Sequence, residues 1–149
     1  MNLKDAIKQN KDFSSNTHEA LVNVQYTSGW LTQLNNQIVA PYKLSMQQFN
    51  VLRILRGQHP KSVTVKFIIE RMIDKSSNAS RLVDKLLAKD LVERHQCPND
   101  RRQVDISISD KGLDMLAVVD KDLERIYDAI NLNEDEAKTL STLLDKLRS

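Results

Sequence analysis

The stretch that decides the fold is Cys97–Ser109, which reads CPNDRRQVDISIS. It begins with a turn-forming Pro-Asn-Asp tripeptide, followed at once by two adjacent arginines, Arg101 and Arg102. The segment LVERH at residues 91–95 comes before the turn, and the segment QVDISIS follows the arginines. The sequence therefore predicts a β-hairpin with both arginines at its tip.

The second strand of this hairpin alternates strictly between apolar and polar residues. A period of two is typical of a strand with one face against a core and the other in solvent. The apolar members, expected to face inward, are Val104, Ile106 and Ile108. The polar members, expected to face outward, are Gln103, Asp105 and Ser107.

The segment before the hairpin, Ser76–Lys89, is predicted to be an amphipathic helix. Asp74 or Ser76 is a suitable N-cap, because a side-chain oxygen there accepts a hydrogen bond from a free backbone N–H. The apolar face has the i, i+3, i+4, i+7 spacing of a helix and consists of Ala79, Leu82, Val83, Leu86 and Leu87. The opposite face is polar and basic and consists of Ser77, Asn78, Arg81, Asp84, Lys85 and Lys89.

Helical periodicity accounts for most of the remaining chain. The other expected helices span about residues 17–39, 45–56, 63–72, 109–130 and 133–147. Pro41 is expected to end the first of them, and Gly57 with Pro60 the second. The side chains expected to face inward in the third are Val65, Ile68, Ile69 and Met72. The expected N-caps of the second, fourth and fifth are Ser45, Ser109 and Asn133.

The composition is that of an ordinary globular protein of 149 residues, 40% hydrophobic and 28% charged. No apolar run approaches the roughly 18 to 20 residues that span a bilayer, and the N-terminus lacks the apolar core of a signal peptide. The single cysteine fits a reducing compartment, so we expect a cytoplasmic protein. Residues 60–103 hold ten basic and six acidic residues, whereas residues 104–149 hold six basic and eleven acidic ones. Such asymmetry is expected of a module that meets a polyanion on one face.

Two short helices, a helix with a basic outer face and a hairpin with arginines at its tip form the element order of a winged helix-turn-helix. A helix fits the major groove of DNA, where Ser, Asn and Arg side chains hydrogen-bond base edges or phosphates. An arginine at the hairpin tip fits the phosphate backbone or the narrower minor groove. Two alternatives stay open here. In one, the arginines form an exposed pair whose charge is balanced by Asp100 and Asp105. In the other, Ser77 and Asn78 serve only to cap the helix.

Two segments carry a resemblance to a known family: DKSSNASRLVDKLLAKDLVER at residues 74–94 and NDRRQVDISISDKG at residues 99–112. They resemble the core of the MarR family, the multiple-antibiotic-resistance type transcriptional regulators. One departure is Asp90, where the family pattern usually has a glycine that ends the recognition helix. Because Asp tolerates a left-handed backbone less well than Gly, this difference bears on local geometry rather than on the fold.

The resemblance implies a mainly α-helical fold with a small β-hairpin wing, in a single domain of residues 1–149. Residues of about 45–110 are expected to form the winged-helix DNA-binding part, and residues of about 1–42 and 110–149 the dimerisation helices. The residues expected to meet DNA are Ser76, Ser77, Asn78, Ser80, Arg81 and Lys85 in the recognition helix and Asp100, Arg101 and Arg102 in the wing. Of these, Asp100 is expected to orient a neighbouring arginine.

The terminal helices support a homodimer independently of the resemblance. Their apolar stripes carry more side chains than a small middle domain can cover, and a second copy is the economical way to bury them. The expected operator is then pseudo-palindromic, with half-sites about 34–36 Å apart. A monomer whose terminal helices pack back on the middle domain is the alternative.

Two sensory sites are candidates. The resemblance implies that a small phenolic or aromatic anion binds between the dimer helices and the winged part, and Tyr26, Trp30 and Tyr42 are candidate lining residues. Plain core packing of these aromatic residues is the alternative. Cys97 is a candidate redox residue, because neighbouring arginines such as Arg94 favour a reactive thiolate. An incidental hairpin thiol is the alternative there.

No enzyme, cofactor or metal site is expected. His18, His59 and His95 show no metal-binding spacing, and the chain has no Gly-rich phosphate loop or G-x-S-x-G motif. His95 and Cys97 are too few ligands for a metal. We therefore expect a homodimeric regulator that binds double-stranded DNA, acts as a repressor and is released by a small aromatic ligand. The alternatives are a winged-helix protein-interaction module and a regulator switched through Cys97.

Overall fold

The computed structural model describes residues 1–149 as a mainly helical chain with one small antiparallel sheet. In chain order the elements are α1 (Leu3–Ala6), α2 (Asn16–Val39), the 3-10 turn η1 (Ala40–Tyr42), α3 (Met46–Gln58), β1 (Val63–Thr64), α4 (Val65–Arg71), α5 (Ala79–Ala88), β2 (Val92–Cys97), β3 (Asp100–Ile108), α6 (Asp110–Asp128) and α7 (Glu134–Leu147). The predicted fold class, mainly α with a hairpin wing, is confirmed.

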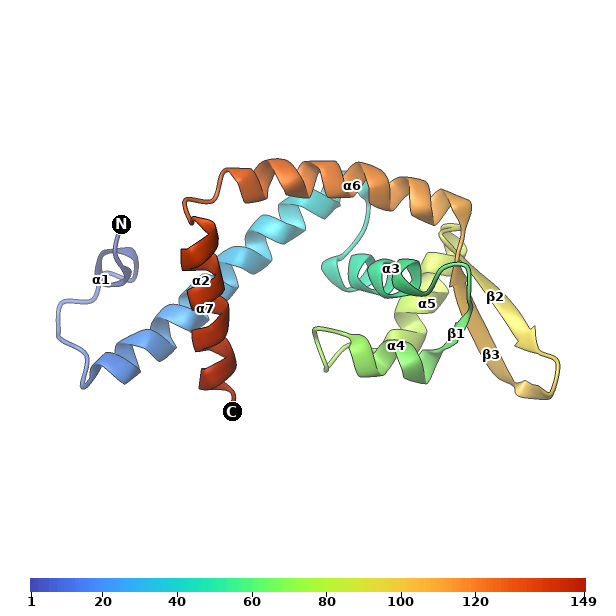
Figure 1. Ribbon diagram of the computed structural model, residues 1–149, viewed down its shortest axis with the longest axis horizontal. Helices are drawn as coiled ribbons and strands as arrows, with labels where there is room; N and C mark the ends of the chain where they lie inside the picture. Colours follow the sequence, from blue (N-terminus) through green and yellow to red (C-terminus); the bar gives the residue numbers. More distant parts are fainter.

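The elements form two parts joined by one long helix (Figure 1). Helices α3, α4 and α5 and the sheet make a compact body, called here the winged part and comprising residues 44–109. Helices α1, α2 and α7 lie at the other end with both termini. Helix α6 runs along both parts and contacts α3 and α2. None of these helices combines the length and the apolar character needed to cross a membrane.

The hydrophobic core lies in the winged part and in its joint with α2 and α6. The core side chains of α3 include Phe49, Leu52 and Leu55. The core side chains of α5 and the sheet include Ala79, Val83, Leu86, Val92, Ile106 and Ile108. Helix α6 adds Leu116, Val119 and Leu123. The recognition-helix face and the strand alternation predicted from the sequence are thus confirmed for these residues, whereas Leu82, Leu87 and Val104 are only partly buried and Ser107, expected to face solvent, is buried.

The predicted caps explain where several helices begin. The Ser45 Oγ accepts a hydrogen bond from the Gln48 backbone N–H at 3.1 Å, and the Gln48 side chain accepts one from the Ser45 N–H at 3.1 Å. Ser109 and Asn133 cap α6 and α7 as predicted. Helix α3 continues past Gly57 to Gln58, so that glycine does not end it.

The sheet contains a strand that the sequence did not reveal. Residues predicted to open a helix form β1 instead and pair antiparallel with the middle of β3, with Val63 opposite Ile106, in the order β1-β3-β2. Thr64 then caps α4, because its Oγ1 accepts from the Phe67 N–H at 3.1 Å. The prediction that Ile69 faces inward was wrong: its side chain is 46% exposed. Ile68 and Met72 are buried as predicted, and because successive residues of a helix point about 100° apart, Ile69 faces away from the core beside Ile68.

Candidate nucleic-acid interface

The recognition helix is shorter than the predicted Ser76–Lys89, because α5 begins only after Asn78. Asn78 is its N-cap, and the Asn78 Oδ1 accepts a hydrogen bond from the Arg81 N–H at 3.1 Å. This contact satisfies one of the free donors at the start of the helix. The oxygen of Asn78 is thereby committed to the helix, which leaves its amide NH2 group for another partner.

Asp74 shapes the turn before α5 instead of capping the helix. Its Oδ1 accepts from the Ser76 backbone N–H at 2.9 Å and from the Ser76 hydroxyl at 2.6 Å. These two hydrogen bonds hold the pKa of the Asp74 carboxyl below its ordinary value. Short polar side chains that bond to nearby backbone in this way compete with helix formation. The expected caps, Asp74 and Ser76, therefore form a turn together, and the helix starts later.

A polar hollow of about 280 Å³ opens where this turn meets α3 and α5. Its lining residues are Gln47, Asp74, Ser76, Ser77, Asn78, Arg81, Leu82 and Lys85. The hollow thus gathers five of the six residues expected to meet DNA in the recognition helix, all but Ser80. Gln47 was not predicted to lie at this site, because it is the packing of α3 against α5 that brings it there and no local sequence motif predicts such a contact. The Ser77 Oγ is buried in the hollow without a hydrogen-bond partner.

The outer face of α5 carries positive charge with little compensation. Ser80, Arg81 and Lys85 are exposed, and neither Arg81 nor Lys85 forms an ion pair. The one acidic residue of this face, Asp84, accepts a hydrogen bond from Arg94 of β2 at 2.9 Å. The acid is therefore matched by a cation from the hairpin, and the two cations of α5 stay available to an external anion.

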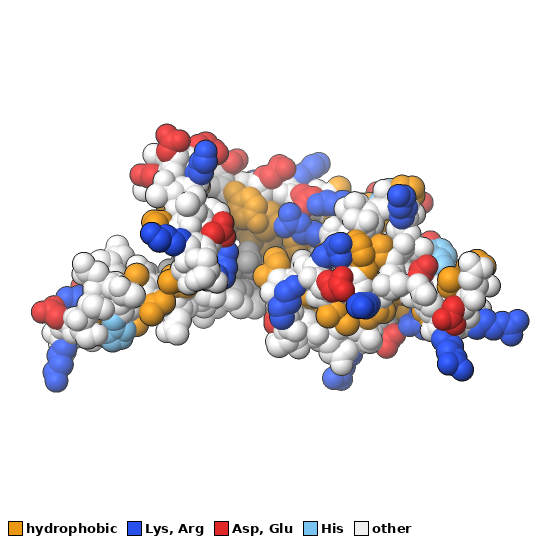
Figure 2. Space-filling view, turned by 60° about the horizontal axis from the view of Figure 1, so that its bottom comes forward, with side chains coloured by type: hydrophobic (Ala, Val, Ile, Leu, Met, Phe, Trp, Pro, Cys, Tyr) orange, Lys and Arg blue, Asp and Glu red, His pale blue; other side chains and the backbone are white.

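The hairpin explains why the two arginines stand together at its tip. Gln96 lies opposite Val104, and the next residue, Cys97, lies opposite Asp100. The residues of β3 left without a counterpart on β2 are Arg101, Arg102 and Gln103. A bulge of this kind expels residues from the ladder and re-aims their side chains. Both arginines are exposed, and Figure 2 shows Lys and Arg side chains projecting at the hairpin end of the molecule.

Asp100 holds the backbone of the bulge rather than a guanidinium group. Its Oδ1 accepts from the Arg102 backbone N–H at 2.9 Å. Neither Arg101 nor Arg102 makes an ion pair with any carboxylate of the chain, including Asp105. The expected orienting role of Asp100 toward an arginine side chain is therefore not seen. Two guanidinium groups lie at the wing tip without an internal counter-charge.

The segment with these features matches a known family, since residues 44–104 fit the MarR family. The winged part of the chain is a MarR-family domain. A curated relative is the HTH-type transcriptional regulator MgrA of Staphylococcus aureus, which is 29% identical over 113 residues, 76% of each chain. The family and its winged-helix fold, expected from the sequence, are confirmed.

Solved structures of MarR-type proteins share the whole fold. The MarR transcription factor from Planctomyces limnophilus is 28% identical with a TM-score of 0.70, over 92% of this chain and 98% of that one. A MepR–DNA complex from S. aureus is 17% identical with a TM-score of 0.76, over 91% of this chain and 96% of that one. The likeness includes the terminal helices as well as the winged part, because it extends far beyond residues 44–109.

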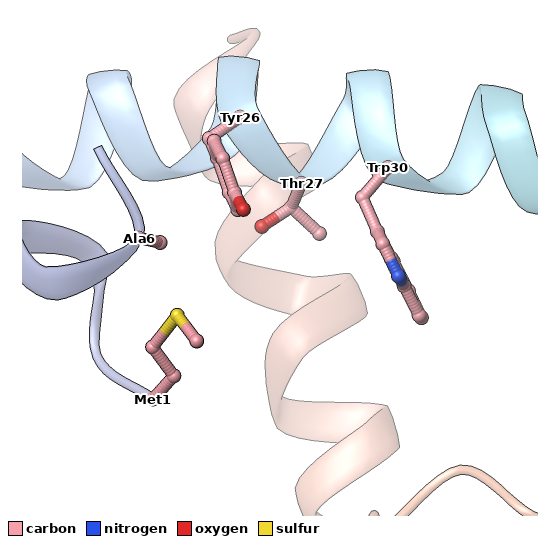
Figure 3. A pocket seen from close by; sticks show the side chains of 5 residues that line it. All are labelled: Met1, Ala6, Tyr26, Thr27 and Trp30. Atoms are coloured by element: carbon pink, nitrogen blue, oxygen red, sulfur yellow. The ribbon is translucent and has the colours of Figure 1, made fainter. Parts of the chain in front are cut away.

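The sensory residues expected in this MarR-family chain are only partly brought together. Tyr26 and Trp30 of α2 line an open hollow of about 240 Å³ (Figure 3). Its other lining residues are Met1, Ala6 and Thr27. Tyr42 lies elsewhere: the turn around Pro41 directs it to α6, where its hydroxyl donates a hydrogen bond to Asp122.

The remaining candidate residues have ordinary surroundings. Cys97 is a partly buried free thiol at the end of β2. The His95 Nε2 lies 2.8 Å from the Ser107 Oγ across the hairpin, which accounts for the burial of Ser107, a residue expected to face solvent. No cluster of three or more His, Cys, Asp or Glu side chains is arranged to hold a metal ion.

Proposed function

We propose that this MarR-family regulator binds a pseudo-palindromic operator in duplex DNA as a homodimer and represses transcription by occupying the promoter. The observation that carries the proposal is the pair of unmatched arginines, Arg101 and Arg102, expelled from the hairpin ladder at the wing tip. A guanidinium without an internal carboxylate partner pairs most favourably with a phosphate or with the negative potential of a narrow minor groove.

Helix α5 supplies the second half of the argument. The polar hollow at its start combines neutral hydrogen-bonding groups with Arg81 and Lys85. Such a set suits base edges and phosphates in the major groove, which admits an α-helix. In the proposed complex, Ser76, Ser77, Asn78, Ser80 and Arg81 face the bases, Lys85 faces the backbone, and the wing follows the neighbouring groove.

The terminal helices support the dimer. The exposed apolar side chains of α2 include Leu21, Val24 and Leu31, and those of α7 include Leu140, Leu143 and Leu147. Aligned stripes of this size are disfavoured on a monomer in water and are buried by a second copy. We accordingly assign residues of about 45–110 to DNA binding and residues of about 1–42 and 110–149 to dimerisation.

The experiment is selection of random duplex DNA by the purified protein, followed by anisotropy titrations of the enriched duplex at several salt concentrations. Wild type is compared with R101A/R102A and with the matched control K138A/K146A, which removes two positive charges from α7. Each phosphate contact contributes about −0.9 to the slope of log K against log salt, so the wing variant is expected to lose close to two units of slope per protomer.

The same titrations give the contrary outcomes. Loss of affinity in the α7 control equal to that in the wing variant would mean that net charge matters and the wing does not. No enriched sequence, with weak binding by all three proteins, would favour the alternative of a winged-helix protein-interaction module.

A ligand that releases the operator is a second element of the proposal, favoured by the hollow beside Trp30. That side chain is 48% exposed and reports on its surroundings through its fluorescence. Titration with salicylate, a small phenolic anion, is expected to change both Trp30 emission and operator affinity. If neither signal responds, the ligand-release element is abandoned and the DNA-binding proposal stands unchanged.

A further inference from the structure

Two polar contacts hold α6 where it meets the winged part, one from α3 and one from the η1 turn that precedes the winged part, and they lie at opposite edges of the buried stripe of that helix. The Tyr42 hydroxyl in η1 donates a hydrogen bond to the Asp122 carboxylate. The Arg56 guanidinium in α3 pairs with the Asp120 carboxylate, and both side chains are about two-thirds buried, at 34% and 30% exposure.

Asp120 and Asp122 lie on different sides of α6, so the two contacts hold this helix from both sides of its buried stripe. At 3.6 residues per turn, two side chains that are two positions apart in the sequence, such as those of Asp120 and Asp122, point about 200° apart around a helix. The buried side chains Leu116, Val119 and Leu123 occupy the sector between them. Asp120 and Asp122 therefore flank the apolar seam, and one is held from α3 and the other from the turn after α2.

Beyond the first turn of α6, where the Lys111 Nζ donates to the Lys89 carbonyl, no other side-chain hydrogen bond connects this helix to the rest of the chain. The rest of the joint is apolar packing, which is strong but non-directional. Hydrogen bonds have preferred directions, so the two contacts resist rotation of α6 about its own axis. The hydrogen bond to Asp122 also raises the pKa of the Tyr42 hydroxyl.

We infer that Tyr42 and Arg56 are positioning residues for operator recognition, which hold Asp122 and Asp120 and thereby set the half-site spacing that the dimer selects. The inference rests on the proposed function. In a dimer built on the terminal helices, α6 connects each winged part to the two-fold axis, so the angle at this joint fixes the separation of the two α5 helices. One base-pair step is only about 3.4 Å, so a small rotation at the joint changes the preferred spacing.

The test uses the duplex enriched by wild type and two derivatives with one central base pair inserted or deleted. Wild type is expected to prefer the selected spacing by about tenfold, because misplaced half-sites force deformation of the DNA. The variant Y42F/R56M is expected to bind all three duplexes within about threefold of one another, with the same salt slope as wild type. The control Y127F/R148M makes the same chemical changes away from this joint: Tyr127 is exposed, and Arg148 pairs with Asp145 at the end of α7. It should keep the wild-type preference.

The outcomes separate this inference from its foundation. A parallel loss of affinity for all three duplexes in Y42F/R56M, with the spacing preference intact, would show that the contacts are merely structural and would overturn the inference. If the double variant unfolds, as judged by circular dichroism, Y42F alone decides the question, since it removes one hydroxyl and keeps the ring. Failure of wild type to bind DNA in a salt-dependent way would overturn the proposed function itself.

Discussion

The winged part and the outer helices α2 and α7 both have apolar stripes, but the burial of these stripes is opposite. Helix α3 buries Phe49, Val51, Leu52 and Leu55, whereas the 14 residues of α7 include none that is buried. Helix α2 buries only Ile38 and Val39 among its 24 residues, next to the winged part. The difference teaches that a stripe shows which face of a helix is apolar but not what covers it. One copy of the chain covers the stripes of the winged part and leaves the outer ones open.

The largest effect is expected at Gly112, where α6 leaves the winged part. A Cβ atom there would lie 2.3 Å from the Leu91 carbonyl oxygen and 2.7 Å from the Ile108 Cγ1. The Leu91 carbonyl cannot yield easily, because it also accepts a hydrogen bond from the Ser109 N–H at 3.1 Å. Gly112→Ala is therefore expected to lower the free energy of unfolding by about 3 kcal/mol or more, as measured by urea denaturation.

The matched control for this change is Gly57→Ala in α3. A Cβ atom at Gly57 meets nothing within 4 Å, so the substitution is expected to stabilise the helix by about 0.5–1 kcal/mol. Equal small effects at both glycines would mean that the joint between β3 and α6 is looser than this contact implies. That result would weaken the contrast between a tightly packed winged part and the open outer helices.

The next effect is expected at the outer helices. L140E/L143E places two carboxylates on the exposed stripe of α7, where the leucines are 46% and 58% exposed. If a second copy covers this stripe, burial of the charges is expected to weaken dimerisation by about 100-fold or more, measured by sedimentation equilibrium. The control T142E adds a charge on the opposite face of the same helix and should leave the dimer intact. Wild-type protein that sediments as a monomer would refute the assignment of these helices to dimerisation.

The sequence was sufficient for the features that local pattern determines. The period of the α5 face predicted the side that packs on the core, although Leu82 and Leu87 at its edges are only partly buried, and the alternation in β3 predicted that Ile106 and Ile108 face the core. Ser109 and Asn133 were identified as caps, because a cap is a local choice between a side chain and a few backbone donors. The family resemblance then predicted the winged fold.

Long-range packing could not be predicted from local sequence patterns. The strand β1 has only two residues, and its pairing with Ile106 depends on a segment about forty positions away. The start of α5 was placed too early. Ser76 donates hydrogen bonds to Asp74 instead of entering the helix, and this choice depends on turn geometry that the sequence pattern does not show. Tyr42 was grouped with Trp30 as an aromatic candidate for a ligand pocket, whereas the structure turns it toward Asp122.

The smallest effect is expected at Asp90, the departure from the family pattern. Its φ of 58° lies in the left-handed region, where the family usually has glycine. Asp90→Gly removes the steric cost of a Cβ atom in that conformation and is expected to stabilise the winged part by about 0.5–1 kcal/mol in urea denaturation. Ala88→Gly, two residues earlier in ordinary helical backbone, is the control and is expected to cost about as much.

The sign of the Asp90→Gly effect and its dependence on protein concentration both bear on the comparison between the two parts. A gain that is the same at low and high protein concentration assigns Asp90 to the winged part, which is covered within one chain. If a second copy covers α7, a stability change in L140E/L143E must instead vary with concentration, because the contact that it removes then lies between two chains. Destabilisation by Asp90→Gly would show that the Asp90 side chain contributes more than its backbone strain costs.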